Sequence, residues 1–239
     1  MAPSVKKLED VIEAIGRAKL EAAKRTLSHW LRISAKQHEN GLGFSLDASS
    51  RFSDPRRPHA KFGVIYLGQD LTTAVAETIV RDRKDGHPGF MPMSYEEAIG
   101  RWRIFDISTI EPLALLDLTG TSRMFHGVPT DTVLHSSHGA SQALSLAIHE
   151  HERAFDGILY ASRHTGGLCI ALYDRAFGKL SILKSELLSN LTGSLAVDQR
   201  RSGPRLKPRQ LLEATVEHGI RGGPDWRRSG PRQNPESTF

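Results

Sequence analysis

Residues 51–80 read RFSDPRRPHAKFGVIYLGQDLTTAVAETIV, and this stretch sets an arginine, a strand and an apolar helix with one acidic residue in close succession. The run 64–67 is β-branched and aromatic and lies between two glycines, a pattern that predicts a strand interior. After a short turn, Thr72 or Thr73 can cap a helix whose valine, alanine and isoleucine side chains share one face. Glu77 follows Thr73 by one turn, so a rigid element is expected to carry its carboxylate.

Three side chains of this stretch favour a ligand site. The carboxylate of Glu77 near an apolar face, Tyr66 on the preceding strand and the upstream Arg51 together suit a substrate that is cationic, or becomes so, at one end and is anionic at the other. Each residue type also has an ordinary role, because exposed glutamates, core tyrosines and surface arginines occur in most folds. The interpretation therefore depends on the rest of the chain.

The composition is that of an ordinary globular protein. With 239 residues, of which 38% are hydrophobic and 25% charged, the chain is predicted to form one main domain. Cys169 is the one cysteine and lies in an apolar run, so we interpret it as a buried core thiol. The net charge of +5 favours anionic partners in general.

The sequence shows no signal for secretion or membrane insertion. No apolar run approaches the roughly 20 residues that a membrane-spanning helix needs, and the N-terminus is too charged for a signal peptide. We therefore expect a cytoplasmic protein without a membrane partner.

Hydrophobic periodicity predicts a chain in three parts. Residues 1–29 are expected to contain an amphipathic helix over 5–29, residues 30–188 to form the main domain, and residues 189–239 to be a basic, partly disordered C-terminal extension.

Within the main domain, strands alternate with helices and loops. Strands are predicted at 28–37, 64–67, 101–108, 158–162, 168–173 and 180–185, and residues 113–118 form either a strand or a short buried segment. A helix is predicted over 141–155, loops over 38–50 and 119–140, and an exposed excursion over 82–92.

Several common site motifs are absent. His149 lies in an HEHE run, but the HExxH spacing of zinc proteases would need a histidine where Arg153 stands, so no metal site is predicted. Neither GxxxxGK[ST] nor GxGxxG occurs, so a nucleotide would have to be held otherwise, for example by guanidinium forks from Arg32 and Arg51. Ser162 lacks the flanking glycines of a nucleophile elbow.

Two longer blocks give the sequence a family resemblance. Arg32 on an early strand, Arg51 followed by Phe52, and the blocks GVIYLGQDLTTAVAETIV (63–80) and DGILYASRHTGGLCIALYDR (156–175) are together similar to the RES domain. That family is named after its Arg, Glu and Ser residues and supplies toxins of bacterial toxin–antitoxin pairs. The resemblance covers residues 30–185 and implies an α+β fold, similar to ADP-ribosyltransferases, with a split β-sheet core and flanking helices.

The resemblance also implies an active site and an activity that degrades NAD⁺. By the family pattern, Glu77 would stabilise the oxocarbenium-like ribose that forms as nicotinamide leaves. Arg32 and Arg51 would clamp the diphosphate, Tyr66 would face the nicotinamide ring, and Ser162 would orient the ribose or the attacking group. NAD⁺ is then a substrate, and no cofactor is expected.

The acceptor of the ADP-ribosyl group determines the product. Inorganic phosphate gives phosphorolysis, water gives hydrolysis, and a protein side chain gives ADP-ribosylation. Family resemblance favours phosphate or water, which would make the chain an NAD⁺ phosphorylase or NAD⁺ glycohydrolase, and ADP-ribosyltransferase activity remains an alternative. The resemblance further implies a cognate antitoxin, expected to be of helix-turn-helix type, that covers the active site. A homodimer or a hetero-oligomer is equally compatible with the sequence.

A different class of function is a nucleic-acid or protein interaction module. Its basis is the positive net charge and the basic residues that recur between positions 200 and 209. No aromatic residues are interleaved with this run, as stacking recognition of nucleic acid would require. A relative that binds without catalysis is a third interpretation.

Overall fold

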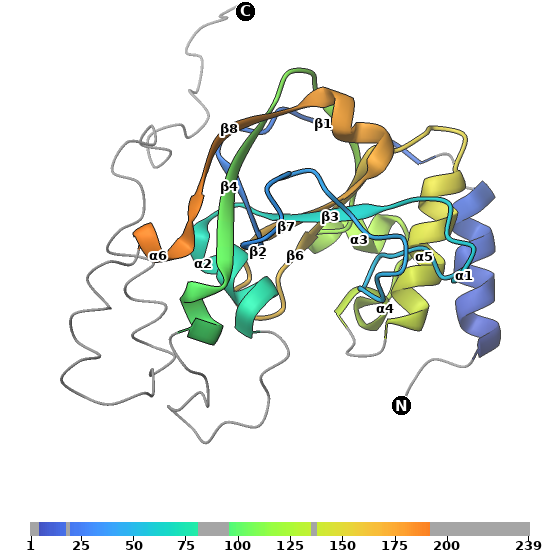
Figure 1. Cartoon of the computed structure of the whole chain (residues 1–239). Coiled ribbons are helices and arrows are strands. Elements are labelled where there is room, and N and C mark those ends of the chain that lie inside the picture. The colour runs from blue at the N-terminus through green and yellow to red at the C-terminus, as the bar shows by residue number, and fades with distance from the viewer. Residues whose placement is uncertain (1–4, 18–19, 81–95, 135–137, 192–239) are drawn as a thin grey trace, which may run out of the picture.

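Figure 1 shows the fold of the chain in a computed structural model, which describes residues 5–17, 20–80, 96–134 and 138–191. The strands are β1 (Ala23–Arg25), β2 (Trp30–Ala35), β3 (Val64–Gly68), β4 (Trp102–Thr109), β5 (Leu113–Asp117), β6 (Gly157–Ala161), β7 (Leu168–Tyr173) and β8 (Leu180–Leu187). The α-helices are α1 (Val5–Arg17), α2 (Leu71–Val75), α3 (Gly120–Phe125), α4 (Thr130–Leu134), α5 (Gly139–Glu150) and α6 (Leu188–Leu191). Two π-helical turns, η1 (Ala76–Val80) and η2 (Glu96–Gly100), and a 3₁₀ turn, η3 (Asp174–Lys179), complete the described elements.

The described strands form one curved eight-stranded sheet in the order β1-β5-β6-β7-β3-β2-β4-β8 (Figure 1). β5 and β6 run parallel, whereas the other neighbouring strands are antiparallel. β2 and β3 are paired at a single position, where Leu31 lies opposite Gly68. The sheet is therefore split at this point, and the predicted α+β fold with a split sheet and flanking helices is confirmed.

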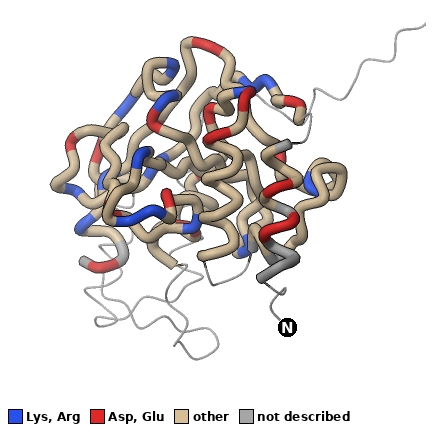
Figure 2. The backbone as a smooth tube through the Cα atoms, turned by 90° about the vertical axis from the view of Figure 1, so that its right-hand side faces the viewer, with Lys and Arg blue, Asp and Glu red and all other residues tan. Residues whose placement is uncertain are grey.

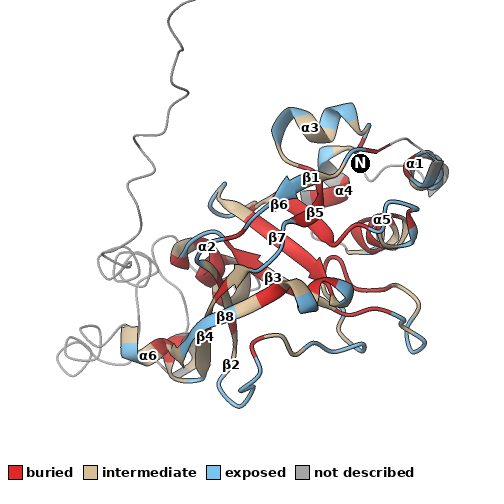
Figure 3. Cartoon of the chain, turned by 90° about the horizontal axis from the view of Figure 1, so that it is seen from above, coloured by how far each residue is buried: buried red, intermediate tan, exposed pale blue. Residues whose placement is uncertain are grey.

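The two faces of the sheet pack against different parts of the core. On β6, Ile158 and Tyr160 belong to the apolar cluster that includes residues of α1 and α5, while Leu159 between them belongs to the cluster on the opposite face. This alternation follows from the two-residue period of a strand. Figure 3 shows buried residues concentrated along β6 and β7, with α1 and α5 on one side of the sheet. Both faces of the central strands are thus covered.

Two predicted elements are wrong in extent. The amphipathic helix does not continue to residue 29, because α1 ends at Arg17 and Ala23–Arg25 pairs with β5 as strand β1. Long-range pairing there overrides the helix preference of alanine and lysine. The predicted loop 119–140 contains the short helices α3 and α4, neither of which is long enough to show a clear apolar period.

Other predictions needed smaller changes. The segment 113–118 was predicted to be either a strand or a short buried segment, and it forms strand β5. The predicted helix 141–155 begins earlier, at Gly139, and ends at Glu150, where His151 turns to an extended conformation. The predicted excursion 82–92 and nearly all of the C-terminal extension lie outside the described residues, and the three-part division of the chain stays a prediction. None of the helices among the described residues is long and apolar enough to cross a membrane.

His149 on α5 packs among aromatic rings. Its imidazole stacks on Phe62 with ring centroids 4.0 Å apart and meets the ring of Tyr173 edge-on at 5.0 Å. Arg175 donates a hydrogen bond from Nη2 to His149 Nε2 at 2.6 Å. Because a guanidinium can only donate, Nε2 must be unprotonated, and the imidazole is neutral. Burial, and secondly the nearby Arg175, lower the pKa of His149 from 6.5 to about 4.

The neutral His149 should make folding stability depend on pH. The pKa of His149 is lower in the folded protein than in the unfolded chain. The contribution of the neutral His149 to the free energy of unfolding is therefore fully present above pH 6.5 and is lost as the pH falls towards 4. For this partly exposed ring we expect a loss of about 1–2 kcal/mol in urea-unfolding free energy. His149→Phe keeps the stacking but cannot titrate, so it should flatten the pH dependence, whereas the exposed-site control His59→Phe should not. Equal slopes for His149→Phe and the wild type would refute this explanation.

Candidate active site

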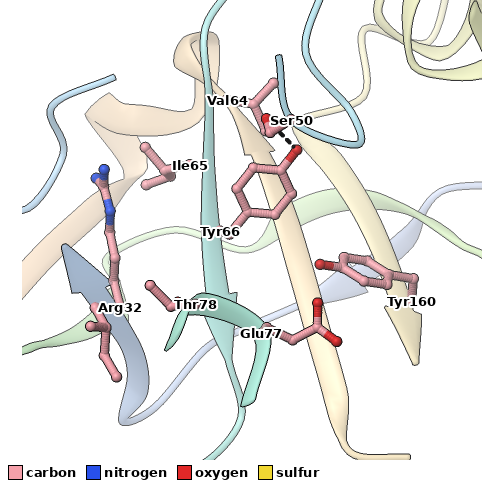
Figure 4. Close-up of a pocket in the computed structure, with 9 residues that line it drawn as sticks. Arg32, Ser50, Val64, Ile65, Tyr66, Glu77, Thr78 and Tyr160 are labelled. Atoms are coloured by element: carbon pink, nitrogen blue, oxygen red, sulfur yellow. Dashed lines mark hydrogen bonds between the residues drawn. The ribbon is translucent and has the colours of Figure 1, made fainter. Parts of the chain in front are cut away.

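A pocket of about 160 Å³ lies where the sheet splits. Its lining residues come from β2, β3, β6, the π-helical turn η1 and the loop before Arg51, and they are Arg32, Ile33, Ser50, Val64, Ile65, Tyr66, Glu77, Thr78 and Tyr160 (Figure 4). Consecutive residues of a strand point to opposite faces of a sheet. Because the pocket touches consecutive residues of both β2 and β3, it must lie in the gap between these strands.

Glu77 is carried by the helix that follows β3. Asp70 caps this helix, since its carboxylate accepts a hydrogen bond from the Thr73 backbone N–H at 2.7 Å. The prediction that Thr72 or Thr73 would be the cap is therefore wrong, because the stronger acceptor lies one turn before Thr73. The helix then widens into η1, a single π turn of a kind that is frequent at functional sites.

Ser162 fixes one oxygen of the Glu77 carboxylate. The Ser162 hydroxyl donates to Glu77 Oε1 at 2.6 Å and accepts hydrogen bonds from the backbone N–H groups of His164 and Thr165 at 3.1 and 3.3 Å. A serine hydroxyl has one proton, and here that proton is committed to Glu77. Within the described part of the chain, Glu77 Oε2 has no hydrogen-bond partner, so this oxygen is available to a ligand. The predicted contact of Ser162 with the ribose stays a prediction.

The turn after β6 also holds the helix that carries Glu77. Thr73 Oγ1 on α2 lies 3.2 Å from Thr165 Oγ1 in this turn. A Cβ atom at Gly167 would come within 2.3 Å of Thr73 Oγ1, so only glycine permits this approach. The Glu77–Ser162 contact therefore rests on close packing between α2 and the turn.

Arg51 is a buried cation that does not line the pocket, although its charge interacts with that of Glu77. It is 5% exposed, and its guanidinium donates to the backbone carbonyl of Val133 at the end of α4. Burial lowers the pKa of Arg51, while the nearby Tyr160 and Glu77 act in the opposite direction. A buried guanidinium close to a carboxylate provides both signs of charge within one site.

Tyr66 links residues 49–52, called here the Arg51 segment, to β3. Its hydroxyl accepts a hydrogen bond from the Phe52 backbone N–H at 2.8 Å and bonds to the Ser50 hydroxyl at 2.9 Å. Its ring stacks on Phe52, with centroids 6.5 Å apart. The structure thus gives Tyr66 a structural role, and its predicted contact with nicotinamide stays a prediction.

Arg32 lines the same pocket, but its guanidinium is directed away from Glu77 (Figure 4). Its two terminal nitrogens donate to the backbone carbonyls of Gly41 and Gly43 in the loop 38–50. Burial lowers the pKa of Arg32 to about 10. A Cβ atom at Gly41 would meet the Phe105 ring at 2.5 Å, so the loop lies close against the sheet. In this structure Arg32 holds the loop, and a contact with diphosphate stays a prediction.

A family profile for the RES domain matches residues 25–189. The chain belongs to the RES domain family. It is 31% identical over 117 residues to a protein of Sinorhizobium fredii named "Probable toxin y4kH", and this match covers 49% of the chain and 91% of the relative. A chain in the crystal structure of the M. tuberculosis MbcT–MbcA toxin–antitoxin complex has a similar fold, with a TM-score of 0.57 and 18% identity over 87% of this chain and 98% of that chain.

The RES domain structure brings together residues that the sequence analysis did not name. Tyr160 is directed towards Glu77 in Figure 4, is 3% exposed and meets the Phe52 ring edge-on at 5.1 Å. Burial raises its pKa, so its hydroxyl stays protonated. Tyr160 shares a strand face with Ser162 two residues later, and this period could have identified it. Arg163 was also missed, and it lies close enough to Arg51 to act on that residue's pKa.

The predicted core cysteine is confirmed, because Cys169 is buried and burial raises the pKa of its thiol. Among the residues that the structure describes, no group of three or more histidine, cysteine, aspartate or glutamate side chains is arranged to hold a metal ion.

Arg32→Lys in the RES domain is expected to loosen the loop 38–50. A lysine ammonium is a point charge on a flexible stem and cannot reproduce the fork that reaches two carbonyls. The loss of one such hydrogen bond should speed amide exchange at Leu42 and Gly43 by about 5- to 10-fold. Hydrogen-exchange mass spectrometry tests this, with Arg101→Lys as the control at an exposed arginine. Unchanged exchange in the loop would show that Arg32 does not anchor it.

Proposed function

We propose that this protein is a toxin of the toxin–antitoxin type that degrades NAD⁺ by cleaving the nicotinamide–ribose bond, with phosphate or water as the acceptor. The observation that carries the proposal is the Glu77 carboxylate, which Ser162 orients at 2.6 Å and which leaves one oxygen open to a pocket between the split strands. Membership of the RES family and the names of the relative and of the structural neighbour support the toxin assignment.

The chemistry needs a negative charge next to the ribose. As the bond from ribose C1″ to the nicotinamide nitrogen breaks, its electron pair moves to nicotinamide and neutralises the pyridinium, while positive charge develops on the ribose. Glu77 Oε2 is the group proposed to stabilise that charge, because a fixed carboxylate in a partly buried site stabilises a cation without reorganising. Water then adds at C1″ with loss of a proton to give ADP-ribose, or phosphate adds to give ADP-ribose 1″-phosphate.

The pocket size decides which part of NAD⁺ it can hold. Its volume of about 160 Å³ is below the roughly 300–1,000 Å³ that is typical for a site enclosing a whole drug-sized ligand. We therefore place the nicotinamide and its ribose in the pocket and the anionic diphosphate towards an arginine. Arg51 is the candidate next to Glu77, and Arg32 is the candidate at the loop.

The charges around Glu77 favour phosphate as the acceptor. Arg51 and Arg163 lie close enough for their charges to interact, and Arg51 also interacts with Glu77. Neither arginine lines the pocket, but a phosphate anion that approaches Glu77 from their side would be attracted by both guanidinium groups, which pair well with phosphate. Water needs no such pair.

A protein partner that covers the pocket completes the proposal. The structural neighbour comes from a toxin–antitoxin complex, which supports an antitoxin for this chain as well, and we expect a helix-turn-helix type. A nucleic-acid module is not favoured, because Figure 2 shows basic and acidic residues interspersed over the face that carries α1 and α5. The basic run 200–209 lies outside the described residues.

The test is to incubate the purified protein with NAD⁺, with and without inorganic phosphate, and to identify the products by mass. We expect release of nicotinamide in both cases, faster with phosphate, and ADP-ribose 1″-phosphate as the main product when phosphate is present. If folded protein released no nicotinamide under either condition, the proposed activity would be excluded. Release with ADP-ribose as the product in both cases would assign water as the acceptor.

A further inference from the structure

Side chains of α5 and of His138, the residue just before it, hold the backbone of the segment that carries Arg51. His138 Nδ1 donates to the Ser49 carbonyl at 3.1 Å, Gln142 Nε2 to the Ser50 carbonyl at 2.9 Å, and Ser145 Oγ to the Phe52 carbonyl at 2.7 Å. Positions 138, 142 and 145 are four and then three residues apart, which places them on one face of a helix. One side of α5 is thus matched to successive carbonyls of the Arg51 segment.

The Arg51 segment has no regular secondary structure to fix it. It leads from the loop 38–50 towards β3. The carbonyls on either side of Arg51 accept hydrogen bonds from α5, and the Ser50 carbonyl also accepts one from the Ser53 backbone N–H at 3.2 Å. The guanidinium itself is bonded to Val133 of α4, which precedes α5 along the chain. The position of Arg51 therefore depends on α4 and α5 as well as on Tyr66 of β3.

Gln142 is the member of this set whose effect can be isolated. It is 7% exposed, it does not line the pocket, and it bonds to the carbonyl of the residue directly before Arg51. Ser145 also contacts the Tyr173 hydroxyl, so a change there would disturb the core as well. Tyr66 lines the pocket, so a change there would alter the site directly.

We propose that Gln142 is a positioning residue that sets the Arg51 guanidinium for the anionic part of the substrate. The inference rests on the proposed function, because it takes the ligand of Arg51 to be the phosphate groups of NAD⁺. A binding site must hold its groups within about 0.5 Å of the productive geometry, and the hydrogen bond from Gln142 to the Ser50 carbonyl helps to fix the peptide unit from which Arg51 follows. Gln142 acts through Arg51 and does not touch the ligand.

A positioning role predicts an effect on one half of the ligand only. In Gln142→Met, which keeps the side-chain length but has no amide, ADP-ribose should bind about 3- to 10-fold more weakly, as expected for the loss of one hydrogen bond. Nicotinamide, which carries no phosphate, should bind within about 2-fold of the wild type. In turnover, the KM for NAD⁺ should rise by a larger factor than kcat falls.

Dissociation constants for ADP-ribose by calorimetry and for nicotinamide by ligand-observed NMR test the inference. Gln37→Met, at an exposed glutamine, is the matched control and should bind both ligands like the wild type. If Gln142→Met does not fold, Gln142→Asn takes its place, because its amide is one methylene too short to reach the Ser50 carbonyl but keeps the site polar.

Each outcome has a separate meaning. Selective loss of ADP-ribose binding supports the positioning role. Equal weakening of both ligands, or unchanged ADP-ribose binding in a folded variant, overturns it and leaves the proposed function standing. Failure of the wild type to bind ADP-ribose would instead count against the proposed function itself. The inference would then also fail, because it assumes that Arg51 binds the phosphate groups of NAD⁺.

Discussion

Glu77→Gln is expected to remove NAD⁺ loss almost completely, by a factor of about 10²–10³, without unfolding the protein. The carboxamide is nearly isosteric, and its oxygen can still accept the hydrogen bond that Ser162 donates at 2.6 Å. What disappears is the negative charge, which the proposed mechanism needs when the ribose becomes cationic. The measurement is nicotinamide release by purified protein at saturating NAD⁺, together with a thermal melt.

The control for Glu77→Gln is Glu111→Gln, the same change at an exposed position in the turn between β4 and β5. It should turn over NAD⁺ like the wild type. ADP-ribose binding should survive in Glu77→Gln, because this product carries no developing positive charge. Turnover by Glu77→Gln at the wild-type rate would contradict the assignment of the carboxylate.

Arg51→Lys is expected to weaken ADP-ribose binding by about 10- to 100-fold, the range expected for the loss of a hydrogen bond to a charged group. Arg51 is 5% exposed and already bonds to the Val133 carbonyl, so a ligand must share a planar fork that lysine does not have. Lysine keeps the positive charge of Arg51, so a loss of affinity would be due to the missing planar guanidinium and not to a missing charge. Calorimetry with ADP-ribose measures it, and nicotinamide binding should change much less.

Arg57→Lys is the matched control for Arg51→Lys, because Arg57 is exposed and lies in the same part of the sequence. It should leave both affinities as they are. Equal ADP-ribose affinity in Arg51→Lys and the wild type would show that Arg51 does not bind the anionic part of the ligand, and Arg32 would then be the remaining candidate.

The strands that frame the site were predictable because their signals are local. β3, β6 and β7 are apolar runs next to glycines, and such runs identify strands without knowledge of their partners. β1 was missed because three residues of ordinary composition become a strand only through pairing with β5. Family resemblance led us to expect a split sheet but not the place of the split, since no local pattern shows that β2 and β3 pair at one position alone.

The candidate site was only partly predictable for the same reason. Glu77 and Ser162 are 85 residues apart, and their hydrogen bond depends on the packing of α2 against the turn after β6. Arg32 bonds to backbone carbonyls, which every residue possesses, so its partners leave no signature in the sequence. The contacts of α5 with the Arg51 segment are of the same kind.

The strand order has a consequence for the time at which the pocket appears during translation. β3 is flanked by β2, which precedes it, and by β7, which ends at Tyr173, and Ser162 lies just before β7. Glu77 is therefore synthesised well before Ser162, which orients it, and before β7, which pairs with β3 and so supports Tyr66. The nascent polypeptide has no complete pocket through most of its synthesis, and a cell that makes a blocking protein has this interval in which to bring the two together.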